Sequence, residues 1–300
     1  MSGRILSIQS HVVQGYVGNK SATFPLQVLG FEVDAINSVQ FSNHTGYGSW
    51  KGTIMNSTEL DDQIKGLQDN DLLKQYSHLL TGYIANESFL RQILEVVKEL
   101  KLVNPNLVYV CDPVLGDNGK MYVPKELVPI YAKEVVKVAD ILTPNQYEAE
   151  LLTGMKIASE EDAVRVIDHF HKEGVKIVVL SSTDLGSDDE LISFASIATD
   201  GKHEMYRITI PCIRDTFTGT GDLFAALFLA WTSKTDNNVK VSLEKTQASL
   251  QAVLKRTMEH AKSVAPSGAK LYPRYLELRL VQSMDIFLSP PEMCKASRIR

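Results

Sequence analysis

A Gly-Thr-Gly turn opens an apolar helix in the stretch Asp215-Thr216-Phe217-Thr218-Gly219-Thr220-Gly221-Asp222-Leu223-Phe224-Ala225-Ala226-Leu227. Such a turn exposes unpaired backbone N–H groups at the positive end of the helix, and these groups favour an anion such as a phosphoryl group in transfer. Asp222 would then lie beside that anion, in a position to take a proton from an attacking hydroxyl. The alternative is an aspartate that only caps a Gly-rich helix entry. The local pattern alone leaves both interpretations open.

Outside this turn, short β-branched runs alternate with longer amphipathic segments, which is typical of a parallel sheet wrapped by helices. The short runs predict strands at Arg4–Gln9, Glu32–Ser38, Ser77–Thr81, Leu107–Cys111, Asp140–Leu142 and Lys176–Leu180. The amphipathic segments predict helices at Asn19–Leu29, Thr58–Leu67, Asn86–Leu102, Lys125–Val138, Asn145–Thr153 and Ser159–Lys172. Ser159 and Asp162 predict a capping pair at the start of the last of these helices.

The alternation changes after Ser182. Two strand-like runs, Leu191–Ala198 and Glu204–Pro211, precede two long helices at Gly221–Thr232 and Val241–Lys262. This order indicates an antiparallel edge on a mostly parallel sheet. No Pro/Gly/Ser-rich linker, composition shift or internal repeat divides the chain, so we expect one domain over residues 1–300, with the loop Gln40–Met55 as a candidate lid.

The composition indicates a globular protein and excludes several classes of partner. The 300 residues are 44% hydrophobic and 22% charged, and the 31 basic and 36 acidic residues are interleaved. With a net charge of −5 and no basic stripe, we expect no nucleic-acid partner. No run approaches ~18 apolar residues, and the N-terminus lacks the pattern of a signal peptide. We therefore expect a cytoplasmic protein without a membrane partner.

The cysteines and histidines give no metal site. Cys111, Cys212 and Cys294 are scattered without ligand spacing, which argues against disulfides and structural zinc and favours a reducing compartment. Cys111 is predicted to be a buried thiol at the end of a strand. His169 and His171 are two positions apart on a predicted helix, so they cannot form a metal pair, and we expect both at the surface.

Two further polar clusters follow predicted strands. Asn145 and Glu148 share one helix face, where they could hold Mg²⁺ through water, or they could simply be an N-cap and a first-turn acid. Asp112 and Asp117 follow an apolar strand, at the edge where doubly wound sheets bind ligands, although an Asp-Pro turn is an adequate alternative.

Taken together, the motifs at 145–148 and 215–222 resemble the paired signature of ribokinase-like kinases, Asn-x-x-Glu and then Asp-Thr-x-x-Gly-x-Gly-Asp. Within that superfamily the chain is similar to animal pyridoxal kinases along nearly its whole length, in the stretches 6–12, 15–19, 24–31, 37–47, 80–83, 110–117, 143–152, 219–226 and 277–283. The resemblance implies a ribokinase-like α/β fold. The central sheet would be mostly parallel, with helices on both faces, an antiparallel edge and a small lid loop.

The resemblance also implies an activity, namely ATP-dependent phosphorylation of the 5′-hydroxymethyl group of pyridoxal, pyridoxine and pyridoxamine to give the 5′-phosphate. It implies that Asp222 is the catalytic base and that the amides of Gly219, Thr220 and Gly221 form the anion hole. The residues that match the pyridoxal pocket, with Asp222, are Ser10, Val17, Thr45 and Tyr83. Those that match the ATP site are Asn145, Ser181, Ser182, Tyr122, Thr220 and Gly221. Those that match the cation region are Asp112, Asp117, Thr143 and Glu148.

The cations implied are Mg²⁺, or another divalent ion such as Zn²⁺, and a monovalent ion such as K⁺ or Na⁺; the assembly implied is a homodimer. Two alternatives stay open. The chain could be a hydroxymethylpyrimidine or sugar kinase of the same superfamily, because Asp222 and the Asn145/Glu148 pair serve any alcohol acceptor. It could also be a non-catalytic protein that binds vitamin B6 or a nucleotide, since a fold does not determine a function.

Overall fold

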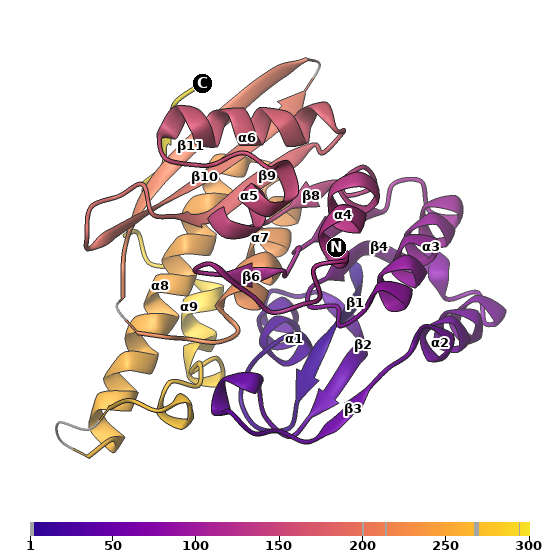
Figure 1. Ribbon diagram of the computed structural model, residues 1–300, viewed down its shortest axis with the longest axis horizontal. Coiled ribbons are helices and arrows are strands. Elements are labelled where there is room, and N and C mark those ends of the chain that lie inside the picture. Colours follow the sequence, from indigo (N-terminus) through magenta and orange to yellow (C-terminus); the bar gives the residue numbers. More distant parts are fainter. Residues whose placement is uncertain (1–2, 200, 214, 267–269, 294) are drawn as a thin grey trace.

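A computed structural model describes residues 3–199, 201–213, 215–266, 270–293 and 295–300 (Figure 1). Cys294 lies outside the described residues. Ten strands form one sheet in the order β12-β11-β10-β9-β8-β5-β4-β1-β2-β3. Their bounds are β1 Arg4–Val12, β2 Glu32–Phe41, β3 Gly52–Ile54, β4 Tyr76–Thr81, β5 Val108–Cys111, β8 Ile141–Leu142, β9 Ile177–Thr183, β10 Glu190–Thr199, β11 Lys202–Pro211 and β12 Ser297–Arg298. A separate small hairpin consists of β6 (Gly116–Asp117) and β7 (Lys120–Met121).

The middle of the sheet is parallel, from β2 through β1, β4, β5 and β8 to β9. The strands β10, β11 and β12 add to it in antiparallel fashion on one side, and β3 does so on the other. The predicted mostly parallel sheet with an antiparallel edge is therefore confirmed. Because the parallel strands run in one direction, their carboxyl ends meet at a single edge of the sheet.

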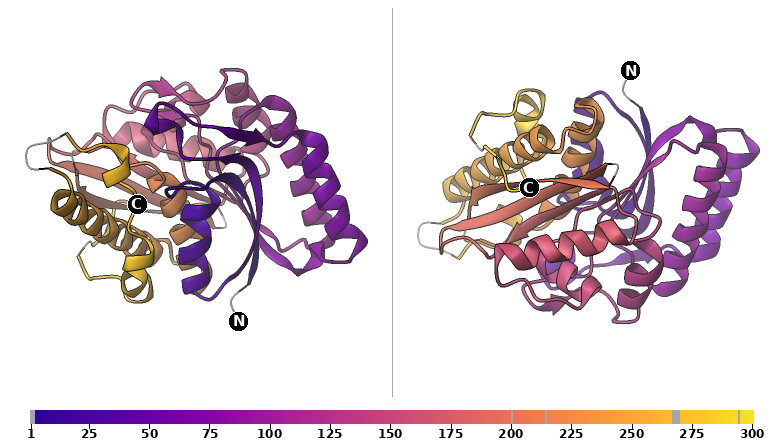
Figure 2. Two further views of the ribbon diagram at one scale, coloured as in Figure 1. Left: turned by 90° about the horizontal axis from the view of Figure 1, so that it is seen from below. Right: turned by 90° about the horizontal axis from the view of Figure 1, so that it is seen from above.

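Helices cover both faces of the sheet, so the fold has three layers (Figure 2). One face carries the helices α1 Asn19–Val28, α7 Thr220–Lys234, α8 Val239–Val264 and α9 Met284–Leu288. The other face carries α2 Ser57–Asp69, α3 Glu87–Val103, α4 Leu127–Ile130, α5 Gln146–Thr153 and α6 Glu160–Lys172. Short 3₁₀ turns lie at Thr45–Tyr47, Leu73–Gln75, Pro273–Tyr275 and Val281–Ser283. In the part of the chain described here, no helix combines the length and apolar character needed to cross a bilayer.

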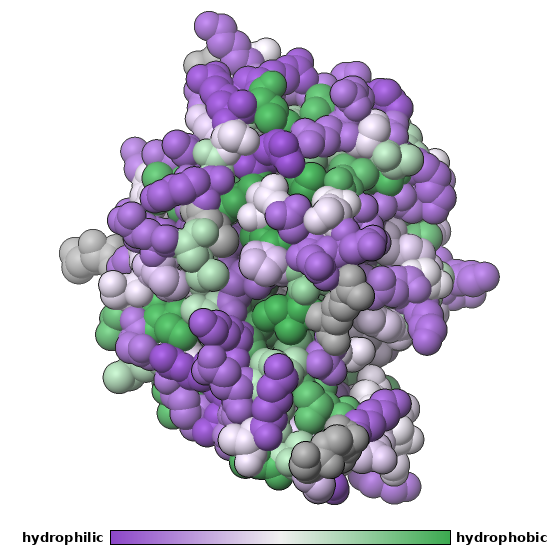
Figure 3. Space-filling model, turned by 90° about the vertical axis from the view of Figure 1, so that its left-hand side faces the viewer, coloured by the Kyte–Doolittle hydropathy of each residue, from purple (hydrophilic) through white to green (hydrophobic). Residues whose placement is uncertain are grey.

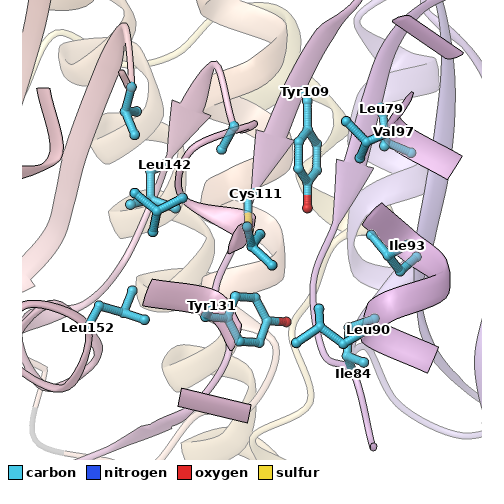
Figure 4. Close-up of a cluster of buried hydrophobic side chains, with 14 of the residues drawn as sticks. Leu79, Ile84, Leu90, Ile93, Val97, Tyr109, Cys111, Tyr131, Leu142 and Leu152 are labelled. Atoms are coloured by element: carbon cyan, nitrogen blue, oxygen red, sulfur yellow. The ribbon is translucent and has the colours of Figure 1, made fainter. Parts of the chain in front are cut away.

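Each face of the sheet buries its own hydrophobic cluster. On the α3/α4 side, Tyr109 and Cys111 of β5 lie in one cluster with Tyr131 and Leu142 (Figure 4). Cys111 is fully buried, as predicted, and burial raises the pKa of its thiol to about 12. The outer surface shown in Figure 3 is mostly hydrophilic, with hydrophobic residues in scattered groups. The chain therefore places its apolar residues where a two-sided sheet requires them.

Local expectations were mostly confirmed, with three differences. Ser159 caps α6 by accepting the Asp162 N–H at 3.2 Å, as predicted. The helix predicted at 125–138 is instead the short α4 followed by a π-helical turn at Tyr131–Val135, in a segment where Pro129 supplies no backbone N–H. The expected loop 40–55 is the connection of a β2–β3 hairpin: only its ends pair as strands, and the stretch between them carries a 3₁₀ turn at Thr45–Tyr47.

The surface assignment of His171 is wrong. Its side chain is buried, with Nδ1 2.8 Å from the carbonyl oxygen of Val175 and Nε2 2.8 Å from the hydroxyl of Ser196. Positions two apart on a helix point in nearly opposite directions. One of His169 and His171 therefore had to face the sheet.

Candidate active site

The turn before α7 is packed backbone to backbone against the segment Gly15–Gly18. Gly219 precedes the helix in the left-handed region, at φ 85°, and a Cβ placed on it would lie 2.0 Å from the carbonyl oxygen of Tyr16. The hydroxyl of Ser21 donates to the carbonyl of Gly219 at 3.0 Å. Only glycine combines this φ with so close an approach. The fold therefore fixes the turn rather than leaving it as a free loop.

Asp222 does not cap its own helix. The backbone N–H of Gly18 donates to its Oδ2 at 2.7 Å, and among the described residues this is the one hydrogen bond to the carboxylate. Burial raises the pKa of Asp222, and the N–H of Gly18 opposes that shift. The carboxylate is half-buried and keeps free acceptor capacity. It is thus available to accept a proton.

A second carboxylate faces the same turn from the sheet edge. Asp112, which directly follows β5, is buried, and the hydroxyl of Thr143 donates to its Oδ1 at 3.3 Å. Its Oδ2 has no hydrogen-bond partner among the described residues, and a Cβ on Gly221 would lie 3.6 Å from that oxygen. Burial, together with the charges of Glu148 and Asp222, raises the pKa of Asp112 well above its ordinary value. An unpaired acid in this position favours a cation nearby.

Glu148 is held much more completely. Its Oε2 accepts the Asn145 N–H at 2.9 Å, and its Oε1 accepts the N–H groups of Leu115 at 3.0 Å and Gly116 at 3.4 Å. Asn145 caps α5 through the Glu148 N–H, so the two residues form a capping box. Burial still raises the pKa of Glu148, to about 8. The capping interpretation of this pair is therefore correct for its geometry, and the carboxylate also anchors the chain after β5.

These groups meet at the carboxyl-end edge of the parallel strands. Ser10 lies at a bulge in β1, and a Cβ on Gly18 would lie 2.4 Å from its hydroxyl. Among the described residues, no group of three or more His, Cys, Asp or Glu side chains is arranged to hold a metal ion by itself. The edge therefore brings together a glycine turn at the start of a helix, a half-buried carboxylate with free acceptor capacity and two buried acids. These are the requirements of phosphoryl transfer to an alcohol.

The chain is similar to known kinases. The family model described as "Phosphomethylpyrimidine kinase" matches residues 32–267. The chain is 54% identical to pyridoxal kinase of Sus scrofa and 51% identical to that of Arabidopsis thaliana, with 98% and 99% of this chain and 95% of each relative covered. The chain belongs to the pyridoxal kinase family. A Leishmania donovani pyridoxal kinase in complex with ADP and pyridoxamine superposes with a TM-score of 0.92 at 35% identity over all of both chains.

The predicted pyridoxal-pocket residues of this pyridoxal kinase family member lie around the end of β1. Ser10, in β1, and Val17, within the Gly15–Gly18 segment, are both buried. Tyr83 follows β4, half-buried, and Thr45 is exposed in the 3₁₀ tip of the hairpin. A Cβ on the next residue, Gly46, would lie 3.6 Å from the hydroxyl of Thr218, so the tip reaches the Gly-rich stretch. Their contacts with a substrate stay predictions.

The predicted nucleotide residues lie farther along the same edge. The N–H of Ser181, at the end of β9, donates to the carbonyl of Pro144 at 3.0 Å, which places it next to Asn145. Ser182 is half-buried beside it. Tyr122 is 57% exposed, and its backbone N–H donates to the carbonyl of Leu115. The N–H of Leu115 in turn donates to Glu148, so Tyr122 lies close to the site. Asp117 is exposed in the β6–β7 hairpin, whereas Asp112 and Glu148 are buried, although the charge of Asp117 still contributes to raising the pKa of Glu148.

One residue of the site region was not assigned a role from the sequence. Glu277 lies within a stretch that resembles the family, yet its partners are the N–H of Tyr16 and side chains of the hairpin tip. These partners are 230 to 261 positions away along the chain. No local pattern signals such a contact.

Proposed function

We propose that this chain transfers the γ-phosphoryl group of ATP to the 5′-hydroxymethyl group of pyridoxal, and also of pyridoxine and pyridoxamine. The observation that carries the proposal is the Asp222 carboxylate, held by the Gly18 N–H beside the Gly219–Gly221 turn. Relatives above 50% identity that are named pyridoxal kinases support the acceptor. Related structures with ADP and pyridoxamine or pyridoxine support the donor and the vitamer class.

In this mechanism Asp222 accepts the proton of the attacking hydroxyl as the new O–P bond forms. The amides at Gly219, Thr220 and Gly221 donate to the oxygens of the phosphoryl group in transfer, where negative charge is spread. Because these donors belong to a turn fixed against Tyr16, they need no rearrangement at the moment of reaction. Ser10 and Thr45 donate or accept hydrogen bonds at the pyridine ring, and Val17 and Tyr83 enclose it.

The acids at the edge fit a cation. Asp112 offers a buried oxygen without a partner, and the pKa values of Asp112 and Glu148 are both raised, so a positive ion would stabilise their ionised forms. Asp112, with Glu148 acting through water, would hold Mg²⁺ or another divalent ion such as Zn²⁺, with Thr143 and Asp117 nearby. A monovalent ion such as K⁺ or Na⁺ belongs to the same region. Bound there, the ions would neutralise phosphate charge.

The nucleotide lies, in this proposal, along Asn145, Ser181, Ser182, Tyr122 and the start of α7. Residues 1–300 form one kinase domain, an assignment supported by the sheet that runs from β12 near the C-terminus to β3 near the N-terminus. The resemblance to animal enzymes supports a homodimer and a cytoplasmic location.

A coupled ADP-release assay tests the acceptor directly. It compares pyridoxal, pyridoxine, pyridoxamine, hydroxymethylpyrimidine and ribose at equal concentrations, with ATP and Mg²⁺ in excess. We expect kcat/KM to be highest for the B6 vitamers. The match to the phosphomethylpyrimidine kinase model favours hydroxymethylpyrimidine as the second candidate acceptor, and preference for it would overturn the proposal. If none of the five compounds led to ADP release, the result would instead favour a non-catalytic binding protein.

A further inference from the structure

The Glu277 carboxylate lies where three segments far apart in the sequence meet. Its Oε2 accepts the N–H of Tyr16 at 3.0 Å. Its Oε1 accepts the hydroxyl of Tyr47 at 2.8 Å and lies 3.3 Å from Nε2 of His44. The Glu277 side chain is only 12% exposed. One carboxylate thus connects the C-terminal segment, the hairpin tip and the segment after β1.

The surroundings are shaped for this carboxylate. Gly15 has φ 95°, and a Cβ on it would lie 2.3 Å from Oε1 of Glu277, so any larger residue would displace the acid. Burial alone would raise the pKa of Glu277, but hydrogen bonds from His44 and Tyr47 outweigh it and lower the pKa. Burial also raises the pKa of Tyr47 to about 12, so its hydroxyl keeps its proton and donates. Glu277 is therefore ionised and firmly held at neutral pH.

The residues that Glu277 holds adjoin the acceptor side of the site. Tyr16 packs against Gly219 through its carbonyl, and two positions later the N–H of Gly18 holds Asp222. Val17, between them, is a predicted pocket residue. Thr45, another, stands between His44 and Tyr47. Tyr16 and His44 are thus one position away from a predicted pocket residue, and Tyr47 is two positions away.

We propose that Glu277 is a positioning residue for the phosphoryl acceptor. It ties the hairpin tip to the Gly15–Gly18 segment and thereby sets the distance from Thr45 and Val17 to the Asp222 carboxylate. The identity of the acceptor rests on the proposed function, whereas the contact does not. Asn145, Ser181 and Ser182, three of the predicted nucleotide residues, lie at the start of α5 and in β9. Among the described residues these elements make no hydrogen bond to Glu277, so loss of the anchor should affect the acceptor more than ATP.

The experiment compares four variants by steady-state kinetics. Glu277→Ala removes the anchor, and we expect KM for pyridoxal to rise about tenfold, which corresponds to ~1.4 kcal/mol of lost hydrogen bonding. KM for ATP should stay within twofold of wild type. Glu277→Gln keeps an acceptor oxygen and should recover much of the difference. Tyr47→Phe removes one hydroxyl and should raise KM for pyridoxal by less than Glu277→Ala does. Asp285→Ala is the control, because it breaks an exposed pair with Arg256 at 2.7 Å in the same part of the chain.

Amide hydrogen exchange supplies a readout that does not depend on the substrate. Faster exchange at Tyr16 and Gly18 in Glu277→Ala, but not in Asp285→Ala, is expected if the anchor holds this segment. Unchanged exchange together with unchanged KM for pyridoxal would overturn the inference, as would equal increases in KM for ATP and pyridoxal. If Glu277→Ala does not fold, Tyr47→Phe decides by the same criteria. Wild-type protein that releases no ADP with B6 vitamers would refute the proposed function instead, and exchange would still test the anchor.

Discussion

The helices α5 and α7 begin at the same edge of the sheet, and each carries an acid in its first turn. Glu148 of α5 accepts three backbone N–H groups and completes a capping box. Asp222 of α7 accepts one, from a residue 204 positions away, and leaves its own helix uncapped by a side chain. The same local pattern therefore produces a fully hydrogen-bonded acid in one place and an acid with free acceptor capacity in the other.

The cause of the difference lies in the residue that precedes each helix. Asn145 is extended, and its side chain and backbone engage Glu148 reciprocally. Gly219 is left-handed and offers no side chain, so Asp222 has no capping partner and turns toward the Gly15–Gly18 segment. In α5 the capping residue uses the carboxylate of the first-turn acid in hydrogen bonds. In α7 the glycine makes no such bonds, so the carboxylate of the first-turn acid keeps free acceptor positions.

The largest effect is expected at Asp222. Asp222→Asn should lower kcat by roughly 10²–10⁴-fold with little change in KM, because proton removal is lost only in the transition state. Since burial raises the pKa of Asp222, its ionised form costs stability. The variant should therefore melt at the same temperature as wild type or higher. Near-normal turnover would leave Asp222 with its contact to the Gly18 N–H alone and would refute its role as the base.

Gly219→Ala should have the next largest effect. The added Cβ meets the Tyr16 carbonyl at 2.0 Å, and displacement of the anion hole by about 1 Å can lower kcat about 10²-fold. Gly154→Ala is the matched control, because Gly154 is also left-handed, at φ 70°, but has open space around it. That variant should lose only about 1–2 kcal/mol of stability and keep wild-type kcat. Equal losses of activity in both would show that strain alone is responsible.

The sequence predicts a mostly parallel sheet with an antiparallel edge, and it predicts where α5 and α7 begin. Both predictions rest on local signals, namely the hydrophobic period and the turn residues. It could not choose between the capping and the catalytic interpretation of an acid in a first turn. That choice depends on Leu115, Gly116 and Gly18, which the fold brings from 32 to 204 positions away. The contacts of Glu277 could not be predicted for the same reason, because all of its hydrogen-bond partners are distant along the chain.

The edge strand β3 and the burial of His171 also could not be predicted from sequence patterns. The strand β3 is exposed at all three residues, so it has no alternation to recognise, and it exists only by pairing with Val39–Phe41 of β2. His171 is polar yet buried, because Ser196 and the Val175 carbonyl satisfy its ring. Tertiary partners therefore decide both cases.

A smaller effect is expected at Glu148. Glu148→Gln keeps an acceptor for the backbone N–H groups but removes the charge near Asp112, so the Mg²⁺ concentration for half-maximal activity should rise by up to about tenfold, or ~1.4 kcal/mol. Glu59→Gln is the matched control, because Asn56 and Glu59 form the same capping box at the exposed start of helix α2. An Mg²⁺ titration that is unchanged in Glu148→Gln would leave this residue with its capping role alone.

The smallest effect is expected in the pH dependence of kcat, which distinguishes the acid of α7 from the acid of α5. The pKa of Asp222 is raised by burial, and the base must be ionised to accept a proton. As pH falls through the raised pKa, Asp222 becomes protonated and kcat falls about tenfold per pH unit. The midpoint of this acid limb should therefore lie above the ordinary aspartate value of 3.8. The raised pKa of Asp222 comes from burial and not from the charge of Glu148, so Glu148→Gln should leave the midpoint in place. Measuring kcat against pH in both proteins, at saturating Mg²⁺, decides the assignment. A limb that disappears in Glu148→Gln would belong to the Asp112/Glu148 pair, and α5 rather than α7 would then carry the titrating acid.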